Sequence, residues 1–139
     1  MAPPLLPPKG RSPLTDHVFV AGWDGEKTPA RLLVNGDSMA APMELAFGAK
    51  HRLRLVNIGA SLSPRFALRR DSSLVTWRSI AKDGADLPAT QATARPAIQQ
   101  VSVGETYDFE FEPLERGGYV LSLRLGQATK GWQQRIEVR

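Results

Sequence analysis

The sequence contains no cysteine and only two histidines, His17 and His51, among its 139 residues. The lack of cysteine excludes a disulfide, a thiolate nucleophile and any metal site that needs a thiolate ligand. Two histidines also exclude a site built from several imidazoles of one chain, unless subunits share their ligands. The chain therefore has few residues that could support metal binding and none that could support thiol chemistry.

Long apolar runs are missing as well. The first 13 residues hold five prolines but no apolar stretch long enough for the core of a signal peptide, and no later segment is long enough to span a membrane. Proline fixes φ and cannot donate a backbone hydrogen bond, so residues 1–16 are expected to form a proline-rich extended arm or linker. Residues 17–139 are then expected to form a single domain.

A concentrated basic patch is also absent, although the formal net charge is +4 and the isoelectric point is about 9.9. The arginines are scattered through strand-like segments and are not interleaved with aromatic residues for base stacking. Their pattern is typical of a solvated polar face. We expect neither a nucleic acid nor a membrane as a partner.

What the sequence does contain is short alternating segments separated by turns. The 12 glycines and 11 prolines favour short strands over a helical bundle. About nine or ten strand candidates, with turn signals every 8–12 residues or so, predict an all-β sandwich or barrel. The candidates are His17–Ala21, Arg31–Val34, Glu44–Phe47, His51–Ile58, Arg65–Arg70, Leu74–Lys82, the alternating runs from Tyr107 and from Tyr119, and Trp132–Val138.

Between these strands, Ala85–Pro96 is expected to be a polar connection with room for one helical turn. The two-residue period of the strands predicts which side chains face inward. The predicted core residues of the two facing sheets are Leu53, Leu55, Phe66, Leu68, Tyr119 and Leu121. Asn57 lies on the inward face and can bond neighbouring backbone.

Several segments together resemble the cupredoxin domains of bacterial multicopper oxidases. The segments, in chain order, are Leu32–Gly36, Gly48, His51–Asn57, Ile80–Leu87, Val103–Asp108 and Gly118–Tyr119. The resemblance covers roughly residues 17–125 and implies a cupredoxin-like Greek-key β-sandwich or barrel. It also implies a parent oxidase that acts on phenols or metal ions through copper and is periplasmic or secreted; the sequence itself leaves the location open.

The copper ligands of that family are missing. The family binds copper through H-x-H pairs and through a cysteine flanked by histidines with an axial methionine, because thiolate and imidazole suit that metal. Here the corresponding segment is Ser63–Arg69, in which Phe66 and Leu68 stand where ligating histidines are expected, and Tyr119–Arg139 holds neither cysteine nor histidine. The sequence predicts no catalytic, cofactor-binding or metal-binding residue and no cofactor in this chain.

Four carboxylates, Asp83, Asp86, Glu105 and Asp108, could form an acid–base or calcium cluster. Aspartate before glycine is a common turn pair, and no loop has the alternating oxygen spacing of a calcium site, so turn chemistry is preferred. His17 and His51 are each expected to stand alone among strand residues.

Met39 and Met43 are too few for a thioether copper site, and loop packing is expected for both. Trp23, Trp77 and Trp132 could line a groove, but burial is expected because large rings ordinarily close a sandwich edge.

These features predict a copper-free, non-catalytic structural or interaction domain that packs beside copper-bearing cupredoxin domains or subunits of a multicopper oxidase, and that is not an enzyme as an isolated chain. Two alternatives stay open. One is a free-standing β-sandwich module that binds a polymer or protein through its loops. The other is a subunit of an oxidase that uses copper.

Overall fold

The computed structural model describes residues 15–23, 31–59, 61–126 and 131–139, and these contain thirteen strands and no helix. The strands are β1 (Thr15–Trp23), β2 (Leu32–Val34), β3 (Met43–Leu45), β4 (His51–Asn57), β5 (Arg65–Arg70), β6 (Ser73–Leu74), β7 (Thr76–Lys82), β8 (Ala85–Asp86), β9 (Ala94–Pro96), β10 (Ile98–Gln100), β11 (Thr106–Phe111), β12 (Gly117–Arg124) and β13 (Trp132–Val138). The all-β class predicted from the sequence is confirmed.

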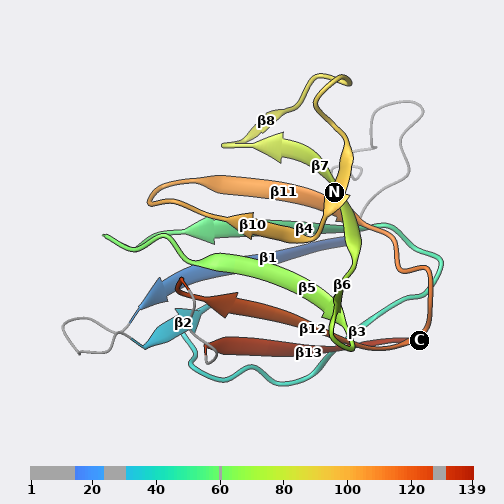
Figure 1. The fold of residues 1–139 in the computed structure, drawn as a ribbon, viewed down its shortest axis with the longest axis horizontal. Helices are drawn as coiled ribbons and strands as arrows, with labels where there is room; N and C mark the ends of the chain where they lie inside the picture. The colour runs from blue at the N-terminus through green and yellow to red at the C-terminus, as the bar shows by residue number, and fades with distance from the viewer. Residues whose placement is uncertain (1–14, 24–30, 60, 127–130) are drawn as a thin grey trace, which may run out of the picture.

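The strands form two sheets (Figure 1). The first, sheet A, has the order β2-β1-β4-β11-β7-β8, with β9 also paired to β7. The second, sheet B, has the order β10-β5-β12-β13-β3, with β6 also paired to β5. Most pairs are antiparallel, but β1 pairs with β4, and β13 with β3, in parallel. Both parallel pairs join strands that are distant in the sequence.

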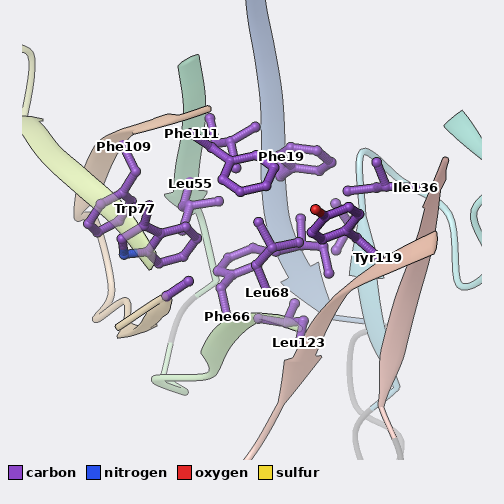
Figure 2. Packing of buried hydrophobic residues seen from close by; sticks show 14 of the residues in the cluster. Phe19, Leu55, Phe66, Leu68, Trp77, Phe109, Phe111, Tyr119, Leu123 and Ile136 are labelled. Carbon is purple, nitrogen blue, oxygen red and sulfur yellow. The ribbon is translucent and has the colours of Figure 1, made fainter. Parts of the chain in front are cut away.

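The core lies between the sheets and is rich in aromatic rings (Figure 2). The Trp77 and Phe109 rings stack at a centroid distance of 4.1 Å, and Phe111 meets Tyr119 edge-on at 5.7 Å. Such contacts add to the stabilisation that comes from burying the apolar area. All six predicted core residues are buried, so the inward faces read from the alternation are confirmed.

The polar connection predicted for Ala85–Pro96 is only partly correct. The segment contributes strands β8 and β9 to the free edge of β7, and between them the Gln91 and Ala92 amides bond the Pro88 carbonyl, which are the hydrogen bonds of one isolated helical turn. The short strand β10 was not predicted. These edge strands are two or three residues long, so their alternation is too brief to be seen in the sequence.

Strand β1 begins at Thr15, two residues before the predicted start of the domain, because Thr15 and Asp16 pair with the first residues of β4. The remaining part of the predicted arm, residues 1–14, lies outside the described residues. No helix in the described part of the chain is long and apolar enough to cross a membrane.

Candidate functional site

Strand β5 carries the positions where the family resemblance places copper-binding histidines. Phe66 and Leu68 are fully buried, and the residues opposite them in β12 are Leu123 and Leu121. Each position is therefore surrounded by apolar side chains that complete the core (Figure 2). Neither side chain offers an atom that could ligate a metal, so the residues present do not fit a copper centre at this place.

The two histidines were expected to stand alone, and this prediction is wrong. The parallel pairing of β1 with β4 sets Thr15 opposite His51, and His17 is two residues further along the same face. The rings lie 5.5 Å apart between centroids, and His17 Nε2 is 3.4 Å from His51 Nδ1. The fold therefore joins two imidazoles that are 34 residues apart in the chain.

The hydrogen bonds of His51 settle which of its nitrogens carries the proton. His51 Nε2 is 3.0 Å from the Ala46 carbonyl, which can only accept, so Nε2 donates; in the neutral ring Nδ1 then holds the lone pair, on the side that faces His17. Burial, and then the nearby His51, lower the pKa of His17 below its ordinary value, while Asp16 opposes the shift. The lowered pKa favours the neutral form of His17.

The histidine pair does not reproduce a copper centre of the oxidase kind. It supplies two nitrogens from different strands, without a thiolate or thioether. Among the residues described by the structure, no group of three or more histidine, aspartate or glutamate side chains could hold a metal ion. The donor set of this pair therefore lacks the ligands that bind and tune copper in the family.

Asp108 is the most buried of the four candidate carboxylates, with 3% of its surface exposed. It lies on the outer side of sheet A, because its neighbour Phe109 faces the core. Arg52 Nε donates to Asp108 at 2.7 Å, and Arg54 donates through Nε at 3.0 Å and through a terminal nitrogen at 3.0 Å. The hydrogen bonds with Asp108 raise the pKa of Arg54. Asp108 is thus held by ion pairs across β4 and β11, which ties the two central strands together.

Asp83 and Glu105 both lie beside Lys82, at 3.8 Å and 2.9 Å from its Nζ. Asp83 also has a φ of 50°, precedes Gly84, and accepts a hydrogen bond from the Thr106 amide, as a turn residue does. Hydrogen bonds from Lys82 and from the Ser102 amide lower the pKa of Glu105. Asp86 is an exposed residue of β8. The turn chemistry preferred for Asp83 is observed.

The methionines and tryptophans divide between core and surface. Met43 is half-buried and packs against the core, but Met39 is 84% exposed, so the packing expected for Met39 is wrong. Trp77 and Trp132 are buried as predicted, and Trp23 is half-buried against the core.

Solved structures of other proteins have the same architecture. A structure described as a multicopper oxidase matches 94% of this chain over 46% of its own, with 18% identity and a TM-score of 0.72. A copper-containing nitrite reductase from Thermus scotoductus matches 94% of this chain over 32% of its own, with 15% identity and a TM-score of 0.74. The chain has the cupredoxin-like fold. The Greek-key sandwich implied by the resemblance is confirmed.

A blue copper oxidase from Nitrosomonas europaea shares the same cupredoxin-like fold, with 17% identity and a TM-score of 0.69. The match covers 94% of this chain and 47% of the oxidase chain. The chain thus spans less than half the length of each of these three structures. No family model and no curated protein matches the sequence. The fold is therefore assigned from the structures.

Proposed function

We propose that this cupredoxin-like domain is copper-free and non-catalytic, and that it packs beside copper-bearing domains or subunits of a multicopper oxidase. The observation that carries the proposal is the burial of Phe66 and Leu68 in the core, at positions where the resemblance places histidine ligands. A side chain that is fully buried among leucines stabilises the sandwich, and exchanging it for a metal ligand would cost packing.

The surface offers apolar area for such a neighbour to cover. Ile58 is 71% exposed and Val103 is 48% exposed, and the Gly104 amide bonds the Asn57 carbonyl at 3.0 Å, which joins their two loops. Exposed apolar side chains that gather at one place often mark protein contacts. The three solved structures with this fold are each more than twice as long as the segment that this chain matches. Their additional length supports a role for this domain beside further domains.

The proposal is tested by adding cupric and cuprous ion to chelator-treated protein and recording visible absorption together with turnover of a phenolic dye. We expect no intense blue band, because that band requires a copper–thiolate bond and the chain has no cysteine. Dye oxidation should equal that of the same concentration of free copper. Turnover above this level that persists after the excess copper is removed would overturn the proposal.

A further inference from the structure

The outer face of sheet B gathers arginines that are scattered in the sequence. Strands β5, β12 and β13 lie side by side in this sheet (Figure 1). Side chains alternate across a strand, so the neighbours of the buried core residues face outward. Those outward positions include Arg65 and Arg69 in β5, Arg124 in β12 and Arg135 in β13.

The strand register brings these like charges together in two pairs. Arg65 is directly opposite Arg124, and Arg69 and Arg135 lie on either side of Val120 in one row across the sheet. The two pairs are about 13 Å apart along the strands, since four residues separate Arg65 from Arg69. Like charges that are directly opposite destabilise a sheet. The fold therefore holds this group of positive charges at a cost.

The charge of this face is not neutralised within the described part of the chain. None of the four arginine side chains forms an ion pair or a hydrogen bond there, and Arg124 Nε is a buried donor without a partner, which is rare. Glu137, two residues beyond Arg135 in β13, makes no ion pair with it. The outer face of sheet A differs, because Arg52 and Arg54 there pair with Asp108.

The composition of the face indicates the class of partner. All four cations are arginines, which bind carboxylates through a planar fork and are enriched in protein interfaces, whereas lysine is depleted there. No aromatic side chain faces outward from these strands to stack on bases, and no exposed large hydrophobic residue lies on them to enter a membrane. The small Ala67 and Ser122 lie between the two pairs and let another surface approach closely.

We propose that the outer face of sheet B docks an acidic protein surface, which belongs to a neighbouring domain or subunit of the oxidase. The inference rests on the proposed function for the kind of partner, and it adds the face that the partner covers and the charge that it carries. Carboxylates of the partner would lie against the two arginine pairs. Charge complementarity of this kind selects an acidic partner and rejects a basic one.

The test uses three probes: a capped peptide of alternating glutamate and serine, the same peptide with glutamine in place of glutamate, and an oligothymidylate of equal charge. Their affinities are measured by NMR titration of the isotope-labelled chain up to about 10 mM, a range that captures weak binding. We expect the glutamate peptide to bind most tightly and to shift amides of β5, β12 and β13. Added salt should weaken this binding, because screening acts on exposed charges.

Two double variants remove one arginine pair each: Arg65→Gln/Arg124→Gln and Arg69→Gln/Arg135→Gln. Each should weaken the glutamate peptide about twofold to thirtyfold, the range for two exposed charge contacts. The matched control is Lys50→Gln/Arg78→Gln, which removes two positive charges from exposed residues outside these three strands and should leave the affinity unchanged. Amide shifts that are unchanged away from the substitutions show that each variant is folded.

Equal affinities for the two peptides would overturn the proposal. So would shifts that map to another face, an equal loss in the control, or no shift with the glutamate peptide at the highest concentration. Tighter binding of the oligothymidylate would also overturn it and would assign the face to nucleic acid. Dye turnover and copper absorption are not involved in this test, so its failure is distinct from a failure of the proposed function.

Discussion

At the scale of single residues, Leu55 and Arg54 are neighbours in β4 that face opposite sides of sheet A. Leu55 is fully buried, whereas the Arg54 side chain is 42% exposed and pairs with Asp108. Leu55→Ala should lower the free energy of unfolding by about 2–5 kcal/mol, since it removes packing and leaves a cavity. Arg54→Ala should cost about 1 kcal/mol, since Arg52 still holds Asp108. Urea unfolding measures both, and equal losses would show that the inward face is wrongly assigned.

The histidine pair gives a residue-scale prediction for pH. The pKa of His17 is lowered in the folded protein by burial and by His51, so the unfolded chain binds this proton more readily. The free energy of unfolding should therefore fall as the pH drops through about 6.5, the ordinary histidine value, and stop falling from this cause below the lowered pKa.

Other groups also titrate in acid, so the comparison is made with His17→Gln. Unfolding by urea is measured at about pH 8 and about pH 5.5 for both proteins, which spans the histidine range. The variant should lose less stability between the two values. Identical losses would contradict the link between the histidine pair and acid sensitivity.

At the scale of elements, the end of β4 is fixed by Asn57, which is fully buried. Its amide nitrogen donates to the Leu62 and Val101 carbonyls at 2.8 and 2.9 Å, and its side-chain oxygen accepts from the Gly59 amide at 2.8 Å. The role in bonding neighbouring backbone that the sequence indicated for Asn57 is thus confirmed.

Asn57→Ala should lower the free energy of unfolding by about 2–3 kcal/mol, because buried backbone groups lose their partners. The measurement is thermal or urea unfolding, with Gln100→Ala as the matched control. Gln100 is exposed, and its amide makes a single 3.5 Å contact with the Ser63 carbonyl, so its loss should change little. A cost at Asn57 as small as at Gln100 would mean that water replaces the lost bonds.

The elements also show how far the sequence could predict the structure. Arg65–Arg70 and Trp132–Val138 were predicted with the bounds observed for β5 and β13, because half-buried strands of six and seven residues repeat the two-residue period long enough to be seen. Strands β8, β9 and β10 exist through pairing with β7 and β5, and a local pattern cannot report that pairing.

The same reason explains which parts of the candidate sites were found. Phe66 and Leu68 were correctly placed in the core, since strand alternation is local information. The meeting of His17 with His51 depends on the parallel pairing of β1 with β4, across 34 residues. The gathering of four arginines on sheet B depends on the pairing of β12 with β5 and with β13. No periodicity in the sequence carries either arrangement.

At the scale of the whole molecule, the chain is a cupredoxin-like sandwich whose two sheets pack against each other. Two sheets enclose one apolar core, and the histidine pair and the Asp108 ion pairs lie within or beside sheet A. Metal that bound only the folded protein would raise its stability by about 2.7 kcal/mol at a hundredfold excess over the dissociation constant. Folding and stability should instead be independent of copper.

The most direct measurement is the copper content of the desalted protein together with its melting temperature. Chelator-treated wild-type protein and the double variant His17→Gln/His51→Gln are each incubated with cupric ion, desalted and heated. We expect both proteins to retain far less than one copper per chain and to melt at the temperature of their own copper-free samples. Retention of about one copper per chain after desalting, with a rise in melting temperature, would contradict this expectation.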